Sequence, residues 1–441
     1  MSGLALLAML KALNAPSDRA SRRFTAPFTF FFLVLPFGIS TGYMTVTLPF
    51  LLTGAGLSVA AAAAIVALGA SANTFRFLWG PLTDLTLTLR RWYWIGLLAS
   101  AGTLLLLSWM PLRKEALGLI SVVVFLTQVA IALIILPVGG LMAHTVREEQ
   151  KGRAAGWTSA GSMGGTGFGG GAGVWLAAHW SVHAAGLCLT VVMLACGAAL
   201  WFVPDWRSDS TERLASRVRA IGRDLVQTMR SAMPLFSAIL VASPIGVGAA
   251  ANLWSAVATD WHAGPDTVAL VTGLLNGLIS ALTCAVGGWI ADSCGRWWAF
   301  FGSGAMLVVV AITMAVMPRS PTAFAAGVLV YAACLGLALA AYNAVVLHAT
   351  GRGAAATKYS VLSSAGNIPN AYMTAFDGWA HDRFRAGGML VAESIVTVAC
   401  ILAGLTILRW LNNGLARGER DSADFASVGP EVDTIPVAQT E

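Results

Sequence analysis

The sequence predicts an all-α membrane protein with twelve transmembrane helices in two pseudo-symmetric six-helix bundles. Three observations predict it. The 441 residues are 57% hydrophobic and only 11% charged, whereas roughly a quarter of the residues of an average soluble domain are charged. The apolar residues form runs of about 20 or more, the length that crosses a bilayer. Motifs of the first half of the chain recur in the second half at a nearly constant offset.

Runs long enough to cross a bilayer follow one another along the whole chain. Helices are expected there because every backbone group in hydrocarbon must be bonded internally. The charge order of the N-terminal segment is the reverse of a signal peptide's, which predicts that the first span is an uncleaved anchor. The spans cover approximately residues 27–53, 58–80, 92–112, 116–140, 154–177, 182–204, 233–258, 267–291, 297–317, 321–347, 359–380 and 387–410.

The basic residues fix the expected orientation. With the N-terminus inside, 21 of the 27 lysines and arginines fall on inner segments, five fall on outer loops, and Arg76 lies within a span. Such a bias follows the positive-inside rule. It predicts a multi-pass protein of the cytoplasmic (inner) membrane with both termini in the cytoplasm.

Polar segments divide the chain into five parts. Residues 1–26 are a cytoplasmic N-terminal segment, 27–204 the first six-helix bundle and 233–410 the second. The connecting residues 205–232 form a cytoplasmic linker whose apolar positions recur every three or four residues, which predicts an amphipathic surface helix. The polar residues 411–441 are expected to be a disordered cytoplasmic tail.

Corresponding motifs indicate that one half is a duplicate of the other. Gly80 and Asp84 follow the second span, and Gly288 and Asp292 follow the eighth, 208 residues later. Parallel six-helix repeats are typical of transporters in which two bundles rock about a site between them.

The loop after the eighth span carries the sharpest motif, Gly-x-x-x-Asp-x-x-Gly-Arg, formed by Gly288, Asp292, Gly295 and Arg296. Glycine permits a tight turn, the aspartate lies near the positive end of the next helix, and the arginine can pair with a carboxylate. We interpret it as a gating loop together with Gly80 and Asp84. At this position the motif resembles the signature of the major facilitator superfamily, and the chain resembles that family over essentially its whole length.

The first-half copy departs from this pattern, because Asp84 is followed by Leu-Thr-Leu-Thr-Leu before the next arginine. Three further segments are informative: Leu35-Pro-Phe-Gly38, Phe75-Arg-Phe-Leu-Trp-Gly-Pro81 and Lys358-Tyr-Ser-Val-Leu-Ser-Ser-Ala-Gly-Asn-Ile-Pro369. They resemble the branch that contains AmpG-type muropeptide permeases, siderophore importers and acetyl-coenzyme A transporters. This resemblance does not choose among the solutes of the branch.

Polar residues inside the spans are the candidates for solute binding. Arg76 could anchor an anionic group of the solute; the alternatives are pairing with Asp84 or extension of the side chain to the inner interface. The resemblance implies that spans one, four, seven and ten line the cavity. Their polar residues could instead bond neighbouring helices. With Arg76, the candidates are Tyr43, Gln128, Asn252, Tyr342 and Asn343.

Asp377 in span eleven and Glu393 in span twelve are the acidic candidates, both toward the outer side. Carboxyl groups buried in a membrane can take up a proton, which is the usual chemistry of proton coupling. For Asp377 the alternative is a turn at the end of its helix.

These features predict a secondary active transporter that imports a polar or anionic solute, muropeptide-like or siderophore-like, by alternating access with protons. No phosphate-binding loop or metalloprotease motif is present, so we expect an ion gradient as the energy source and neither an enzyme nor a bound cofactor or metal. The expected partners are a small-molecule solute, protons and the lipid bilayer, with no nucleic acid, and the chain is expected to be a monomer. The alternatives are multidrug efflux with proton exchange and a membrane sensor derived from a transporter.

Overall fold

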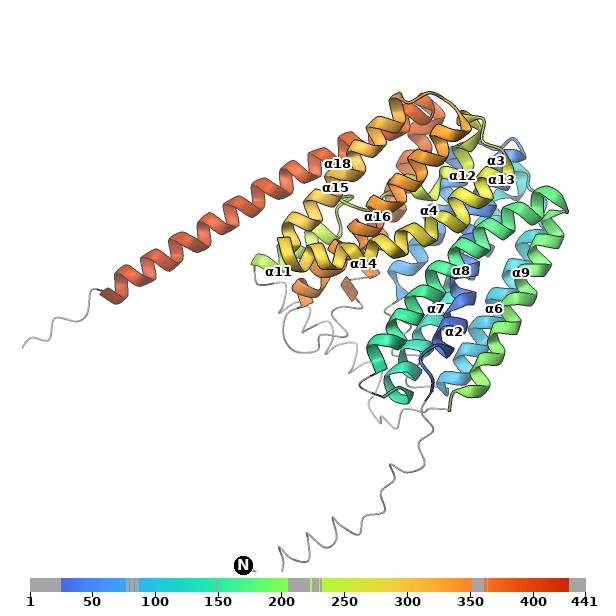
Figure 1. Cartoon of the computed structure of the whole chain (residues 1–441), viewed down its shortest axis with the longest axis horizontal. Coiled ribbons are helices and arrows are strands. Elements are labelled where there is room, and N and C mark those ends of the chain that lie inside the picture. The colour runs from blue at the N-terminus through green and yellow to red at the C-terminus, as the bar shows by residue number, and fades with distance from the viewer. Residues whose placement is uncertain are drawn as a thin grey trace, which may run out of the picture.

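The computed structural model describes residues 25–427 apart from 77–78, 80–82, 84–86, 148–149, 205–222, 224–229, 231, 351–360 and 363. Within this part of the chain the regular structure is helical and no strand occurs. The predicted all-α class is therefore confirmed (Figure 1).

The first bundle is built from helices that follow the predicted spans closely. Its first crossing is α2 with α3, joined by one wider helical turn at Tyr43–Thr47. The elements are α2 (Thr29–Gly42), α3 (Leu48–Gly54), α4 (Val59–Thr74), α6 (Leu89–Trp109), α7 (Leu117–Thr145), α8 (Lys151–His179), α9 (Val182–Cys196) and the short helix Gly197–Phe202.

The second bundle repeats this arrangement with two interruptions, one before α12 and one within α18. In α18, Arg385 has φ 61° and separates two helices that run on from one another. The elements are α11 (Ala232–Val241), α12 (Trp254–Val257), α13 (Pro265–Val268), the wide turns Ala269–Leu275, α14 (Asn276–Cys294), α15 (Arg296–Val316), α16 (Pro321–Thr350) and α18 (Asn367–Ser427).

The described helices are consistent with twelve crossings. Eight of them are long and apolar enough to span a membrane, and α4 and α11 are shorter apolar helices. The glycine-rich α8 is long but less hydrophobic than these eight helices. The long α18 covers most of the last two predicted spans, and the break at Arg385 separates them.

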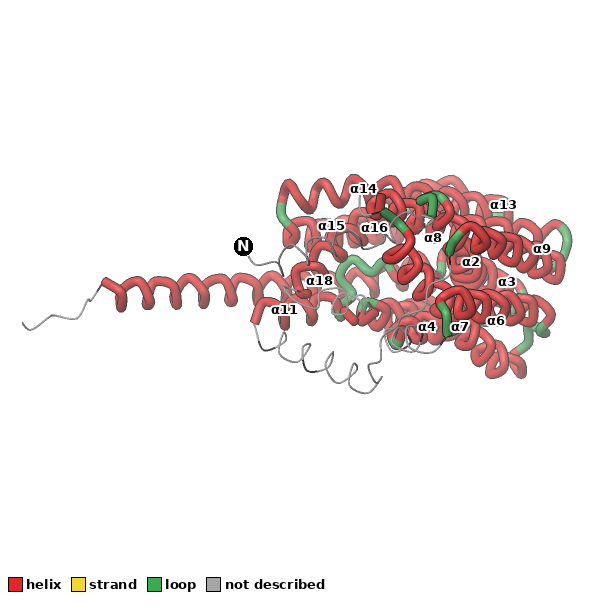
Figure 2. The backbone as a smooth tube through the Cα atoms, turned by 90° about the horizontal axis from the view of Figure 1, so that it is seen from below, coloured by secondary structure: helices red, strands yellow, loops and turns green. Residues whose placement is uncertain are grey.

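Two predicted segments differ in detail from the structure. The seventh span is not one helix over 233–258, because α11 ends at Val241 and helical structure resumes only at Ala249. Between them Gly246 and Gly248 have φ of 75° and 62°, a left-handed conformation that glycine adopts without steric cost. At the other end of the bundle α18 continues to Ser427, so the first part of the expected disordered tail is helical and projects from the molecule (Figures 1 and 2).

The loop that the sequence predicted as a gating loop is shorter than expected. Gly288 and Asp292 lie within α14, and the turn consists of Gly295 alone, with φ 87°, before Arg296 begins α15. Gly80 and Asp84 of the first copy, and the linker 205–232 apart from three residues, lie outside the described residues.

Helices α2 and α8 pack with their backbones in contact. A Cβ atom at Gly165 would lie 2.5 Å from the carbonyl oxygen of Leu35, and one at Gly169 would overlap the carbonyl of Ile39. The glycines that recur every four residues along α8 therefore provide one smooth face for close packing.

The contacts between the bundles that the structure describes gather at one end. There α18 packs on α4 and α8 packs on the turns Ala269–Leu275. Val46, Val59, Ala63 and Val174 of the first bundle share a hydrophobic core with Trp254 and other residues of the second. We call this end the closed end; α3, α12 and α13 lie there together in Figure 1.

Asp260 lies just beyond the seventh predicted span, at the closed end. It is hydrogen-bonded to the turn between the two halves of α18. Its Oδ2 accepts hydrogen bonds from His381 Nε2 at 2.9 Å and from the backbone N–H of Ala386 at 3.2 Å. On the same turn, Asp382 Oδ1 accepts from the N–H of Ala60 at 3.2 Å, in the first turn of α4. The two carboxylates thus link α18 to both bundles.

The hydrogen bond from His381 is the main reason that the pKa of Asp260 lies below its ordinary value of 3.8. A carboxyl group whose pKa is lower in the folded than in the unfolded protein stabilises the fold when it is charged in both states. This stabilisation is full above the unfolded-state pKa and is lost as the pH falls through the folded-state pKa. We therefore expect the thermal midpoint of the protein in detergent to lose this contribution only below about pH 4. The variant Asp260→Asn should have a lower midpoint at pH 7 and a weaker fall on acidification. Identical pH profiles for the two proteins would contradict this.

Candidate functional site

The unwound segment after α11 and the short helical turn Ala249–Asn252 that follows it form one wall of a cavity of about 350 Å³, and α16 and the start of α18 form the rest. Backbone without helical hydrogen bonds is tolerated at membrane depth where it lines a cavity or is buried in protein. Two predicted solute-binding residues, Asn252 and Tyr342, line it. The other lining residues are Gly246, Val247, Gly248, Ala251, Leu335, Leu339, Gly366, Asn367 and Asn370.

Asn252 is held in this wall by two hydrogen bonds to α18. Its Nδ2 donates to Asn370 Oδ1 at 2.8 Å and to Thr374 Oγ1 at 2.9 Å. The hydroxyl of Tyr342 donates to the carbonyl of Leu362 at 3.4 Å. The side chains named here offer both donors and acceptors, so the cavity is suited to a polar solute.

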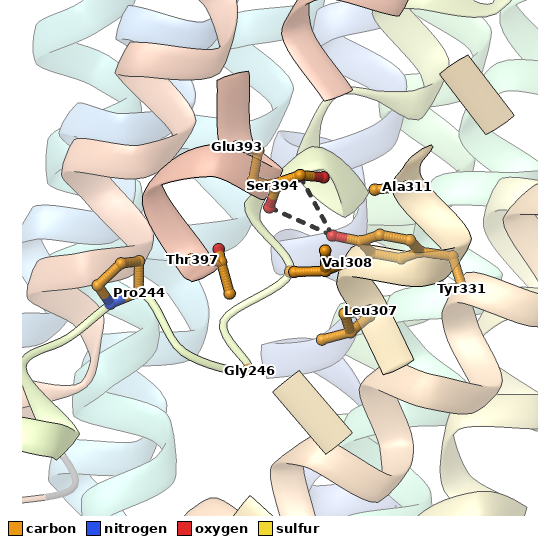
Figure 3. Close-up of a pocket in the computed structure, with 10 residues that line it drawn as sticks. Pro244, Gly246, Leu307, Val308, Ala311, Tyr331, Glu393, Ser394 and Thr397 are labelled. Carbon is orange, nitrogen blue, oxygen red and sulfur yellow. Dashed lines mark hydrogen bonds between the residues drawn. The ribbon is translucent and has the colours of Figure 1, made fainter. Parts of the chain in front are cut away.

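A second, much smaller cavity of about 10 Å³ lies on the other side of the unwound segment, with room for about one water molecule. Glu393 lines it, 6% exposed. The hydroxyl of Tyr331 donates a hydrogen bond to this carboxylate, at 3.2 Å from Oε1 and 3.4 Å from Oε2 (Figure 3). The N–H of Ala250 donates to Oε1 at 3.5 Å. The carboxylate therefore accepts a hydrogen bond from the helical turn Ala249–Asn252, which directly follows the unwound segment and whose residues Ala251 and Asn252 line the larger cavity.

Asp377 is completely buried, and neither of its oxygens has a hydrogen-bond partner among the described residues. It lies near enough to Glu393 for the two charges to repel each other. Neither carboxylate has an ion-pair partner in the described part of the chain. Two buried carboxylates that no cation neutralises cannot both be charged without a large cost. This arrangement is suited to binding a proton.

The other predicted solute-binding residues lie away from the Asn252 cavity. Tyr43 is buried in the first bundle, with no hydrogen-bond partner for its hydroxyl in the described part of the chain. Gln128 is also buried there and accepts a hydrogen bond from Asn73 Nδ2 at 3.0 Å. Arg76 and Asn343 are half-buried, and each takes part in an interaction. The structure therefore brings together only Asn252 and Tyr342 of the predicted set.

Sequence reasoning missed Tyr331, Asn370 and Thr374. Each is a polar residue inside an apolar run, which is a detectable signal. The pairing of these residues with Glu393 and Asn252 depends on contacts between helices 62 to 122 residues apart, and no local pattern specifies such contacts.

The two helical bundles, the cavity beside a broken helix and the buried acid pair define a multi-pass membrane transporter. The sequence matches the Major Facilitator Superfamily over residues 29–374. The chain therefore belongs to the Major Facilitator Superfamily and is a secondary active transporter.

Solved structures of transporters share the fold. A POT family transporter in complex with a thioalcohol-conjugated peptide is 14% identical with a TM-score of 0.67, covering 87% of this chain and 96% of its own. A D-xylose–proton symporter is 12% identical with a TM-score of 0.68, covering 86% and 96%. No curated protein matches the sequence significantly.

Proposed function

We propose that this protein imports a polar or anionic solute together with protons, across the cytoplasmic membrane, with both termini in the cytoplasm. The observation that carries the proposal is the position of Glu393. Its carboxylate is bonded to the N–H of Ala250, within the segment whose next residues, Ala251 and Asn252, wall the larger cavity.

This position gives a physical route for coupling. A charged Glu393 attracts the N–H of Ala250 and the hydroxyl of Tyr331 more strongly than a neutral one does, because charge-assisted hydrogen bonds are roughly twice as strong. Loss or gain of the proton therefore shifts the helical turn Ala249–Asn252 relative to α16 and α18. Since Asn252 lies two residues further on and is bonded to α18, protonation changes the wall that contacts the solute.

The solute that we propose is muropeptide-like or siderophore-like. The resemblance to the AmpG-type branch supports this choice, and the asparagine side chains of the cavity can bond the hydroxyl and amide groups of such molecules. The half-buried Arg76 would bind an anionic group from the first bundle. On this topology the closed end faces outward, so the structure represents a state closed to the outside.

Uptake into proteoliposomes tests the proposal. Labelled muropeptide and ferric siderophore are each offered with an imposed pH gradient, acidic outside, and then without one. Accumulation of either solute that depends on the gradient supports import with protons. If neither accumulates, the solute assignment is wrong, and if accumulation is insensitive to the gradient, the coupling assignment is wrong.

Asn252 provides the sharpest test of the cavity. In Asn252→Leu the solute loses a polar contact in the cavity, which costs about 1–3 kcal/mol of binding free energy; Asn370, which also lines the cavity, and Thr374 lose their donor. We expect the KM for uptake to rise about tenfold or more, with the thermal midpoint lowered only slightly. The matched variant Asn413→Leu changes an exposed asparagine of α18 and should leave the KM unchanged. An unaltered KM in Asn252→Leu would exclude this cavity as the solute site.

A further inference from the structure

A groove of about 520 Å³ lies between the start of α15 and the later part of α18, at the end of the molecule opposite the closed end. We call it the α15–α18 groove. Its floor is apolar, formed by Phe301, Leu405 and Leu408. Arg296 and Arg409 also line it, and both are exposed.

The tryptophans around the groove mark its depth in the membrane. Trp298, which lines the groove, is 76% exposed, and Trp410, next to Arg409 in the chain, is 73% exposed. Tryptophan is enriched where a helix leaves the hydrocarbon for the headgroup layer of a bilayer. The arginines therefore lie at headgroup level, and the apolar floor extends toward the acyl chains.

The electrostatics of the groove favour an anion. The N-terminal end of α15, which begins at Arg296, adds partial positive charge to that of the two guanidinium groups. Among the described lining residues none is acidic. Arginine binds phosphate oxygens through two parallel hydrogen bonds, which makes it the usual partner of a phosphate group.

A second groove of similar volume has no arginine among its described lining residues. It lies between the start of α2 and the end of the sixth crossing, with a volume of about 500 Å³. Phe28, Phe32, Ala199 and Phe202 are among its lining residues, and no charged residue is among those that the structure describes there. Both grooves have room for an acyl chain, but only the α15–α18 groove places two arginines above its apolar floor.

We propose that the α15–α18 groove binds an anionic phospholipid, with the phosphate at Arg296 and Arg409 and an acyl chain along Phe301, Leu405 and Leu408. A bound lipid would bridge α15 and α18 at the point where α18 leaves the bundle. Free phosphate has no apolar part that could contact the floor of the groove. A zwitterionic lipid such as phosphatidylcholine carries no net charge to match the two arginines.

Binding of short-chain lipids to the full-length protein in detergent tests the proposal, with tryptophan fluorescence and native mass spectrometry as readouts. We expect phosphatidylglycerol to bind at least about tenfold more tightly than phosphatidylcholine of the same chain length. In Arg409→Gln this preference should shrink severalfold. The matched variant Arg383→Gln removes an exposed arginine near the closed end of α18 and should keep it.

Two further arms separate the lipid from other anions. Leu405→Trp fills the apolar floor and should weaken phosphatidylglycerol binding, whereas Ala199→Trp fills the second groove and should not; melting curves without lipid show whether each variant is folded. Glycerol 3-phosphate should fail to displace the lipid. Equal binding of the two lipids, an unchanged preference in Arg409→Gln, or displacement by glycerol 3-phosphate would each overturn the proposal. If Leu405→Trp does not fold, the Arg409→Gln result decides.

Discussion

Glu393→Gln is expected to abolish accumulation of solute driven by a pH gradient while exchange of solute across the membrane continues. Glutamine is similar in size and can still accept hydrogen bonds from Tyr331 and the N–H of Ala250. It cannot release or take up a proton, so the site is held permanently in its neutral form. The variant should therefore bind and exchange solute without coupling it to protons.

The expected effect is large. One proton that moves down a driving force of 100 mV supplies about 2.3 kcal/mol, enough to concentrate a solute about 40–50-fold. In Glu393→Gln the ratio of inside to outside solute should fall to about one, as measured in proteoliposomes. Counterflow of labelled solute against unlabelled solute should persist.

Glu115→Gln is the matched control, since Glu115 lies in an exposed turn before α7. It should accumulate solute as the parent protein does. Undiminished accumulation in Glu393→Gln would show that the proton is carried elsewhere, and Asp377→Asn would be the next variant to measure. Loss of both accumulation and counterflow in a folded Glu393→Gln protein would assign Glu393 to solute binding instead.

Gly169→Ala is expected to destabilise the first bundle. The added methyl group would overlap the backbone of Ile39 in α2, and backbone, unlike a flexible side chain, cannot move aside cheaply. Overpacking of this kind costs about 1–3 kcal/mol. The thermal midpoint of the purified protein in detergent should fall, with a lower yield of folded protein.

Gly156→Ala on the same helix is the matched control. Nothing lies within 4 Å of a Cβ atom built at Gly156, which is exposed. Alanine is the better helix former by about 1 kcal/mol, so this variant should be neutral or slightly stabilised. Similar midpoints for the two variants would mean that α2 and α8 do not pack as closely as the structure shows.

The membrane class, the all-α fold and the transporter family were predictable from the sequence. A bilayer allows very few structures, because every buried backbone group must be bonded within its own segment. Long apolar runs therefore predict helices almost independently of what packs around them. The repeat of Gly80 and Asp84 as Gly288 and Asp292 further indicated two related bundles.

Asp377 and Glu393 could be named as candidates because a carboxylate inside an apolar run is conspicuous by composition alone. Its surroundings were not predictable. The hydroxyl of Tyr331 reaches Glu393 from a different helix, and Asn252 meets Asn370 across the bundle. Of the predicted solute-binding residues, Tyr43 and Gln128 proved to be buried in the first bundle, since the sequence does not say which face of a hydrophobic helix points inward.

The sequence by itself determined the all-α membrane class, the repeat of motifs between the two halves and where acidic and basic residues lie along the apolar runs. Only the tertiary structure decided that the seventh crossing unwinds at Gly246 and Gly248 beside Glu393, and that the closed end is fastened by Asp260 and Asp382. The physical reason is the distance along the sequence over which each interaction acts. Hydrophobicity and helix formation act along neighbouring residues, whereas a broken helix is stabilised by partners that folding brings from more than a hundred residues away.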